Sequence, residues 1–213
     1  MKGIVSFDMD MTLLNHADYK IPDSAIKALD LLRKNYYIVI ATGRDMDAKF
    51  SEGLADEVKP DAIIHLNGNK ITIGPELIYE HCMKRELVEE LLHFAEGKDY
   101  AIGMTVGDID YFINPWCVTR HDMVRWQMSV RTLAYIGREP GAKEVEAAFP
   151  MLKLPLFSSR EGADIIEKDT SKAEGLKRLC KAWNIPLKNT IAFGDSMNDY
   201  EIVTTAGIGV AMG

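Results

Sequence analysis

The sequence has few cysteines and no long apolar run. Three of its 213 residues are cysteine, and Cys82, Cys117 and Cys180 lie far apart. An odd, scattered set suits neither a disulfide framework nor a zinc site, and it indicates reduced thiols in a cytoplasmic protein. No apolar stretch reaches the roughly 18 residues of a membrane-spanning helix. The N-terminus, MKGIVSFD, also lacks the pattern of a signal peptide.

Basic residues are scarce too. The 25 lysine and arginine residues are outnumbered by 32 aspartate and glutamate residues, which gives a net charge of -7 at pH 7. This balance argues against nucleic acid or a membrane surface as a partner, because phosphate groups attract basic patches. The sequence has no internal repeat or low-complexity tract, so we expect one domain or a domain with a large insertion. It does not indicate an oligomeric state.

Short apolar runs alternate with amphipathic segments at both ends of the chain. Strands are expected at residues 3–7, 36–44 and 61–68, with helices at about 22–33 and 45–56 between them. Near the C-terminus, ADIIE, NTIAFGD and IGVAM are expected strands, separated by the helical segments SKAEGLKRLCKAWN and SMNDYEIVTTAG. Continuous apolar strands joined by helices predict a parallel sheet that is covered on both faces. The predicted fold class is therefore α/β, with a Rossmann-like core.

The middle of the chain has a different pattern. KITIGPELIYEHC predicts a hairpin, KRELVEELLHFAEG an amphipathic helix, and YAIGMTVGDIDYFIN further strands. TRHDMVRWQMSV and GAKEVEAAF predict weaker helical segments. We therefore expect an α+β insertion at residues 71–162, within a core formed by residues 1–70 and 163–213.

Two carboxylates follow the first expected strand. Asp8 and Asp10 project to the same side if the backbone stays extended. Carboxylates this close repel unless a cation lies between them or one holds a proton. A site with oxygen ligands alone suits Mg²⁺, whereas the simpler alternative is a polar turn or helix cap.

Three more strand or helix ends are polar, and ligands of open α/β sheets bind at the carboxyl ends of the strands. Thr42, Gly43 and Arg44 offer a hydroxyl and backbone amides to an anion, although a plain threonine cap would explain them as well. Asp195, Ser196, Asn198 and Asp199 supply more carboxyl and amide groups than capping requires.

Lys172 is informative because of its place in a helix. SKAE, residues 171–174, fits a capping box in which Ser171 caps the helix and Glu174 reaches back. Lys172 then lies in the first turn, where a cation opposes the helix dipole. An anionic partner in front of the helix would offset this unfavourable placement.

Taken in order, D-x-D-x-T, T-G-R, a lysine at a helix start and G-D-x-x-N-D resemble the motifs of the haloacid dehalogenase-like superfamily of phosphotransferases. The resemblance covers nearly the whole chain. The insertion resembles the type II (IIB) cap of the Cof-like sugar-phosphatase branch, and LNGNKI is similar to the loop that opens that cap. The resemblance implies a core that performs the chemistry and a cap that contacts the substrate and excludes water.

The resemblance also implies roles for single residues. Asp8 is the expected nucleophile and forms an aspartyl-phosphate, while Asp10 is the expected acid and then the base that activates water. Asp8, the backbone carbonyl of Asp10, and Asp195 are the expected ligands of Mg²⁺. A further set is expected to hold or support the phosphoryl group: Thr42, Gly43, Arg44, Lys172 and Asn198, with Asp199 in a supporting position.

The sequence departs from the family pattern at two places. Met11 stands where the family has a glycine that eases a tight turn. The insertion is short for this branch, and its candidates for substrate contact are Asn67, Asp108, Asp110, Trp116, Arg120 and His121. For each of these side chains a structural role is the simpler explanation, since aromatic residues at such spacing usually pack in a core and His121 more often lies at a helix start.

The function implied is Mg²⁺-dependent hydrolysis of small phosphorylated metabolites, with sugar phosphates as the expected substrates. A phosphomutase is an alternative, although it typically has a smaller helical cap. A receiver-like phospho-acceptor shares the Mg²⁺, aspartate, threonine and lysine but lacks a large insertion. A binding protein for phosphosugars without catalysis remains a third alternative, and it has no use for Asp10.

Overall fold

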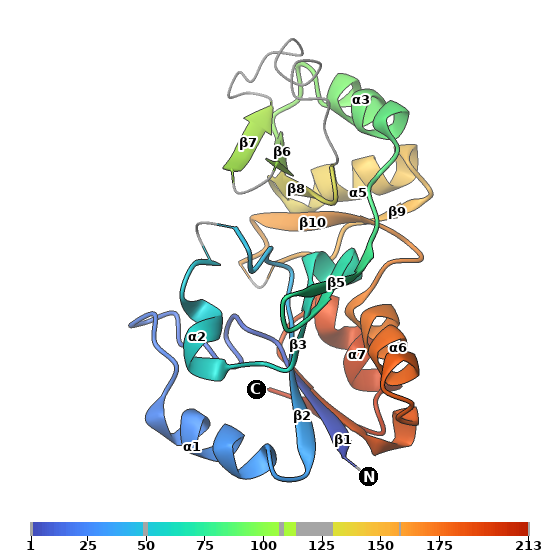
Figure 1. Ribbon diagram of the computed structural model, residues 1–213. Helices are drawn as coiled ribbons and strands as arrows, with labels where there is room; N and C mark the ends of the chain where they lie inside the picture. The colour runs from blue at the N-terminus through green and yellow to red at the C-terminus, as the bar shows by residue number, and fades with distance from the viewer. Residues whose placement is uncertain (1, 49–50, 107–108, 114–129, 158, 213) are drawn as a thin grey trace. The chain divides into compact units, whose positions relative to one another are not determined.

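The computed structural model describes residues 2–48, 51–106, 109–113, 130–157 and 159–212. The chain forms two compact units (Figure 1). The larger unit comprises Met1–Glu80 and Asp169–Gly213, and the smaller unit comprises His81–Lys168. The larger unit is therefore built from both ends of the chain, as the return of the α/β pattern predicts.

The larger unit contains a seven-stranded sheet with the order β12-β11-β1-β2-β3-β4-β5. Its strands are β1 (Gly3–Phe7), β2 (Tyr36–Ala41), β3 (Ala62–His65), β4 (Lys70–Ile73), β5 (Glu76–Glu80), β11 (Thr190–Gly194) and β12 (Ile208–Ala211). The strands from β12 to β3 are parallel, and β4 and β5 add an antiparallel edge. This parallel-dominated sheet confirms the predicted α/β class.

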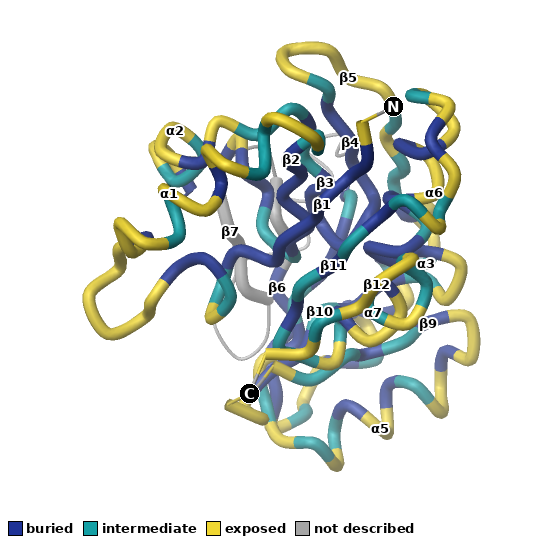
Figure 2. The backbone as a smooth tube through the Cα atoms, turned by 90° about the horizontal axis from the view of Figure 1, so that it is seen from below, coloured by how far each residue is buried: buried dark blue, intermediate teal, exposed yellow. Residues whose placement is uncertain are grey.

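Helices cover both faces of this sheet (Figure 1). They are α1 (Asp23–Leu32), α2 (Leu54–Val58), α6 (Lys172–Ala182) and α7 (Tyr200–Thr205), with 3-10 turns at Leu66–Gly68, Leu187–Asn189 and Met197–Asp199. Adjacent residues of β1 point to opposite faces, so Ile4 packs with Leu176 of α6 whereas Val5 packs with Leu29 of α1. Figure 2 shows the central strands as buried and much of the surrounding helices and loops as exposed.

The smaller unit is an antiparallel sheet with helices. The order of its strands is β7-β6-β8-β10-β9. They span β6 (Ala101–Val106), β7 (Ile109–Ile113), β8 (Leu133–Ile136), β9 (Leu152–Lys153) and β10 (Gly162–Glu167), and the described helices are α3 (Arg85–Phe94) and α5 (Glu139–Ala148). Leu91 of α3, Val145 of α5 and Leu133 of β8 are fully buried in one core, so this unit has its own apolar interior.

The boundaries of the insertion differ from the expected residues 71–162. The hairpin β4–β5 belongs to the larger sheet, because β4 pairs with β3 and its Ile71 is buried in the core beneath α6. The strand β10, expected in the parallel sheet, instead pairs with β8 and β9, and its Ile165 packs in the core of the smaller unit.

The helix expected at residues 45–56 is also shorter than predicted. Within the described residues of this stretch, the α-helix begins only at Leu54, after Gly53, which has a left-handed φ of 81°. Asp45 is held upstream by an ion pair with Lys70, and the amide of Met46 donates to His65. These side-chain contacts fix the preceding segment in an irregular loop that the local sequence pattern does not reveal.

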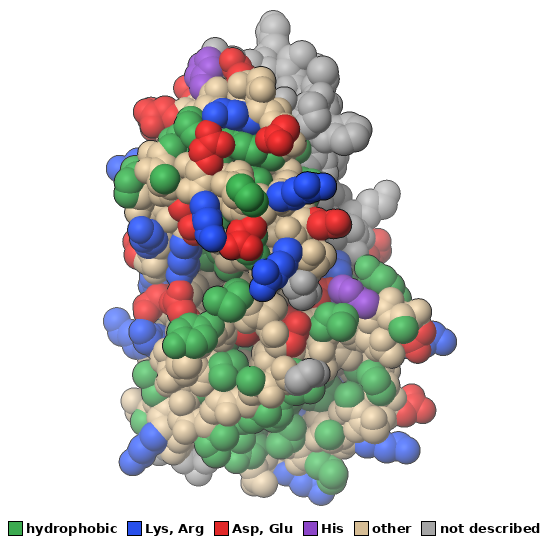
Figure 3. Space-filling model, turned by 180° about the vertical axis from the view of Figure 1, so that it is seen from behind, with side chains coloured by type: hydrophobic (Ala, Val, Ile, Leu, Met, Phe, Trp, Pro, Cys, Tyr) green, Lys and Arg blue, Asp and Glu red, His purple; other side chains and the backbone are tan. Residues whose placement is uncertain are grey.

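On the face shown in Figure 3, the surfaces of the two units differ in chemistry. On the face shown, apolar side chains gather on the larger unit, whereas acidic and basic side chains are interspersed on the smaller one. Tyr200 of α7 and Ile208 of the edge strand β12 are among the exposed apolar residues. None of the helices in the described part of the chain combines the length and the apolar character needed to cross a membrane.

Candidate functional site

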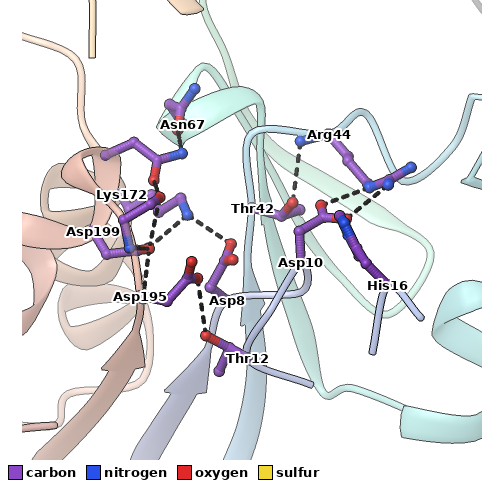
Figure 4. Close-up of polar contacts among 12 residues, drawn as sticks. Asp8, Asp10, Thr12, His16, Thr42, Arg44, Asn67, Lys172, Asp195 and Asp199 are labelled. Carbon is purple, nitrogen blue, oxygen red and sulfur yellow. Dashed lines mark hydrogen bonds and ion pairs between the residues drawn. The ribbon is translucent and has the colours of Figure 1, made fainter. Parts of the chain in front are cut away.

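The polar residues predicted from the sequence meet at the carboxyl ends of the central strands (Figure 4). Asp8 follows β1, Thr42 follows β2 and Asp195 follows β11, and these three strands are neighbours in the sheet. Lys172 is the first residue of α6. Because parallel strands end at the same edge, residues far apart in the sequence come together here.

The amine of Lys172 is buried between two carboxylates. Its Nζ donates to Oδ1 of Asp8 at 2.7 Å and to Oδ1 of Asp199 at 2.6 Å, and the side chain has no exposed surface. Burial disfavours the ammonium, but the charges of Asp8 and Asp199 outweigh it and hold the pKa of Lys172 above its usual value. These two aspartates are the anionic partner that the placement of Lys172 required.

The helix cap in front of Lys172 is half of the predicted capping box. Oγ of Ser171 accepts from the backbone N–H of Glu174 at 3.2 Å, as predicted. The carboxylate of Glu174 accepts instead from Lys177 at 2.6 Å, one turn further along the helix. The single cap bond still fixes the start of α6.

Asp8 carries more negative charge around it than Lys172 neutralises. Its pKa is raised to about 7, first by burial, with the charges of Asp199 and Asp10 adding to the shift and Lys172 opposing it. The pKa of Asp195 is also raised, by burial and then by the charge of Asp199. One ammonium among three carboxylates leaves excess negative charge, and a cation or a proton would stabilise this group.

Asp199 has little capacity left for another ligand. Its Oδ2 accepts from the backbone N–H groups of Asp195 and Ser196, both at 3.2 Å, in a reciprocal capping box with Ser196. The turn is tight, since a Cβ on Gly194 would lie 2.3 Å from Cβ of Asp199. With Oδ1 taken by Lys172, Asp199 supports the site and orients the lysine.

The remaining carboxylates suit a divalent metal ion. Oxygen atoms of Asp8, Asp195 and Asp199 lie within 4.8 Å of one another. Since Asp199 is occupied by its own hydrogen bonds, we regard Asp8 and Asp195 as the side chains able to hold a metal. Carboxylate oxygens are the ligands that hard divalent cations prefer. Thr12, whose hydroxyl donates to Oδ1 of Asp195 at 3.3 Å, keeps that carboxylate in place.

Asp10 belongs to a second group of side chains at the same edge (Figure 4). Arg44 donates from Nε to Oδ2 and from Nη2 to Oδ1 of Asp10, both at 2.7 Å. Nε2 of His16 lies 2.7 Å from Oδ1 as well. Burial alone would raise the pKa of Asp10, but the hydrogen bonds from Arg44 and His16 outweigh it and hold the pKa below its usual value.

The loop after β2 is joined to the loop after β3. The backbone N–H of Asn67 donates to the carbonyl of Thr42 at 3.0 Å, and Oδ1 of Asn67 accepts from Nδ2 of Asn198 at 3.0 Å. The hydroxyl of Thr42 accepts from the backbone N–H of Arg44 at 3.1 Å. Half-buried Gly43 lies between them. Asn67 therefore holds Asn198, and its contact with substrate stays a prediction.

A further acidic cluster beside this loop is bridged by a lysine. Asp45, Asp47 and His65 are close enough to share a metal ion. However, Nζ of Lys70 lies 2.9 Å from Oδ1 of Asp45 and 2.5 Å from Oδ2 of Asp47. Nδ1 of His65 also accepts from the backbone N–H of Met46 at 3.0 Å. These contacts occupy the groups a metal would need, and the cluster braces the loop that contains Arg44.

The sequence gave no reason to single out His16 as a partner of Asp10, because His16 lies in an irregular loop without a recognisable motif. The candidates Asp108, Trp116, Arg120 and His121 lie outside the described residues, as does Cys117. Asp110 lies in β7, of which the backbone alone is described.

The sequence profile of the haloacid dehalogenase-like hydrolases matches residues 5–133 and 108–213. The 5-amino-6-(5-phospho-D-ribitylamino)uracil phosphatase YitU of Bacillus subtilis is 44% identical over 234 residues, which cover 99% of this chain and 86% of that protein. The structure of the HAD subclass IIB sugar phosphatase BT4131 is 25% identical with a TM-score of 0.87, over 100% of this chain and 88% of that one.

The phosphatase BT1666 from Bacteroides thetaiotaomicron is similar in fold, with a TM-score of 0.89 at 24% identity, over 100% of this chain and 84% of that one. The family predicted from the order of the sequence motifs is thus confirmed by profile, sequence and fold together. The chain belongs to the haloacid dehalogenase-like hydrolase family.

Proposed function

We propose that the protein hydrolyses phosphate monoesters of small metabolites with the help of Mg²⁺. The observation that supports this most directly is the buried carboxylate of Asp8, which is held by Lys172 beside the carboxylate of Asp195. A nucleophile, a buried cation and a carboxylate pair able to bind metal are the parts that phosphoryl transfer needs, since positioning and charge neutralisation provide most of the catalysis.

In the first step, a carboxylate oxygen of Asp8 attacks phosphorus and the bond from phosphorus to the ester oxygen breaks. The leaving alkoxide takes a proton from Asp10. In the second step, water attacks the aspartyl-phosphate and gives its proton to Asp10. This hydrolysis releases inorganic phosphate and restores Asp8. Lys172, Asn198, Thr42 and the amide of Gly43 hold the phosphoryl oxygens.

The surroundings of Asp10 suit it directly for the second step. Its lowered pKa keeps the carboxyl ionised at neutral pH, as a base must be. For the first step, the negative charge of an arriving phosphate dianion raises the pKa of a nearby carboxyl. This effect favours protonation of Asp10 before the leaving group departs.

Mg²⁺ would be held by Asp8, Asp195 and the backbone carbonyl of Asp10. When bound, it neutralises charge, so that an anionic nucleophile can approach an anionic phosphate. The excess of carboxylates over ammonium groups and the raised pKa values of Asp8 and Asp195 support this assignment.

Sugar phosphates or phosphorylated sugar alcohols are the proposed substrate class. BT4131 is a sugar phosphatase, and YitU is a phosphatase for a compound with a phosphorylated ribityl chain. Both kinds of substrate are phosphate esters of polyhydroxylated carbon chains. A phosphate-release screen over sugar phosphates, sugar alcohol phosphates and nucleotides identifies the preferred member.

The proposal is tested with p-nitrophenyl phosphate. We expect phosphate release in Mg²⁺, none in EDTA, and recovery when Mg²⁺ is added back. Asp8→Asn should lower the rate by at least about a thousandfold, since it removes the nucleophile. Asp30→Asn, on the exposed side of α1, is the matched control and should leave the rate unchanged. Substantial activity in Asp8→Asn, or activity indifferent to EDTA, would refute the proposal.

A further inference from the structure

The contact between His16 and Asp10 has no counterpart in the motifs of the sequence. His16 lies in the loop between β1 and α1, which is closed by a hydrogen bond from the backbone N–H of Asn15 to the carbonyl of Lys20 at 3.0 Å. Its imidazole stacks on the ring of Tyr19, with the ring centroids 5.4 Å apart and the planes 7° from parallel. The loop closure and the stacking both restrict the imidazole, so its contact with Asp10 is built by this loop.

The hydrogen bonds to Asp10 can be counted against the acceptor sites of a carboxylate. A carboxylate has two oxygens with about four lone-pair sites, and it can accept a guanidinium in bidentate fashion. The fork of Arg44 takes one site on each oxygen. Nε2 of His16 takes the second site on Oδ1. One site is left, and it lies on Oδ2.

We propose that His16 is a positioning residue for Asp10, which it holds so that Oδ2 is the oxygen that exchanges the proton with the leaving group and with water. This inference rests on the proposed function, in which Asp10 is the acid and the base.

Without His16, the contact from Arg44 alone leaves one open site on each oxygen. The carboxyl can then be protonated on either oxygen, so the proton is no longer confined to Oδ2. Proton transfer depends on a donor within hydrogen-bond reach of the atom it serves. Loss of His16 should therefore weaken the protonation of the leaving group without abolishing attack by Asp8.

The test compares two esters of similar shape, phenyl phosphate and p-nitrophenyl phosphate. Phenolate is the more basic leaving group and needs its proton more. In His16→Ala we expect kcat/KM for phenyl phosphate to fall about tenfold, a part of the full effect of general acid catalysis, and kcat/KM for p-nitrophenyl phosphate to change little. The parameter kcat/KM is used because it reports the step in which the leaving group departs.

His16→Gln is the conservative variant, because a carboxamide N–H can still donate to Oδ1 of Asp10. It should restore most of the phenyl phosphate activity. His93→Ala, which removes an exposed imidazole from α3, is the control and should leave both esters unaffected. The side chain of His16 is 40% exposed, so its replacement should leave the thermal unfolding temperature nearly unchanged.

The outcomes separate this inference from the proposed function. Wild-type protein that releases no phosphate from either ester would overturn the proposed function and this inference with it. An active wild-type protein would overturn this inference alone in three cases: if His16→Ala leaves phenyl phosphate turnover intact, if it slows both esters equally, or if His16→Gln fails to restore the rate.

Discussion

Lys172 and Asp8 form a buried ion pair across 164 residues of the chain, with Nζ of the lysine 2.7 Å from Oδ1 of the aspartate. The pair joins the first strand of the sheet to a helix from the second half of the chain. Asp199 accepts a second hydrogen bond from the same amine. The three side chains therefore tie together the two ends of the chain that build the larger unit.

Replacing this lysine should cost stability as well as activity. In Lys172→Met the carboxylates of Asp8 and Asp199 stay buried without their cation, and we expect the free energy of unfolding in urea to fall by about 3 to 5 kcal/mol at pH 8. Lys177→Met is the control on the same helix. It removes an exposed pair with Glu174 and should change the free energy by less than about 1 kcal/mol. Equal losses of unfolding free energy in the two variants would contradict a buried ion pair between Lys172 and Asp8.

The loop that holds Asn198 should not tolerate a methyl group at Gly68. This glycine has a φ of 106°, and a Cβ there would lie 2.3 Å from the carbonyl oxygen of Ser171, which caps α6. Gly74 also has a positive φ, of 52°, but nothing lies within 4 Å of its missing Cβ.

Both Gly68→Ala and Gly74→Ala should lose about 1 to 2 kcal/mol of stability from backbone strain. Gly68→Ala should lose about 1 to 3 kcal/mol more from the steric clash, and it should weaken phosphate binding as an increase in KM. Urea unfolding and steady-state kinetics measure the two effects. A similar unfolding free energy and KM for Gly68→Ala and Gly74→Ala would mean that the loop moves away from Ser171 at little cost.

Met11 should be a site of stored strain. It has a left-handed φ of 60°, and the residue is 54% exposed, so it gains little from burial in return. We expect Met11→Gly to raise the free energy of unfolding by about 1 kcal/mol. Met151→Gly, at another exposed position where φ is not positive, should lower it by about 0.5 to 1 kcal/mol. Thermal and urea unfolding decide the sign, and a loss of stability in Met11→Gly would contradict the prediction.

Binding of Mg²⁺ should depend on pH through Asp8. Its pKa of about 7 in the metal-free fold lies above the value near 4 of an unfolded chain, so the folded protein keeps a proton that the unfolded chain loses. The stability that Asp8 contributes without metal is therefore present at low pH and is lost as the pH rises through about 7.

Because Mg²⁺ needs the ionised carboxylate, its affinity should be about tenfold weaker at pH 6 than at pH 8 and should level off above pH 7. Titration calorimetry at pH 6, 7 and 8 measures this, with proton release detected from the heats in different buffers. Asp8→Asn is the matched variant and should lose the pH dependence together with most of the affinity. An affinity that is the same at all three pH values would contradict the combination of a raised pKa of Asp8 and its role as a ligand.

The core of the site follows from local sequence features. The apolar runs of β1, β2 and β11 predict parallel strands, and the carboxyl ends of parallel strands lie at one edge of the sheet. Asp8, Thr42 and Asp195 directly follow these strands, so the sequence was sufficient to predict that they converge. Ser171 predicts the start of α6 and with it the place of Lys172.

Tertiary contacts decided the remaining features of the fold and the site. The local sequence pattern of a strand or a loop is the same whichever sheet or side chain it pairs with. The hairpin β4–β5 and the strand β10 have ordinary strand patterns, and only their pairing partners assign them to the larger and the smaller sheet. The pairing of Arg44 and His16 with Asp10 depends on how two loops meet in space. Hydrogen bonds and buried ion pairs need a precise distance and direction, and residue order alone does not specify either of these.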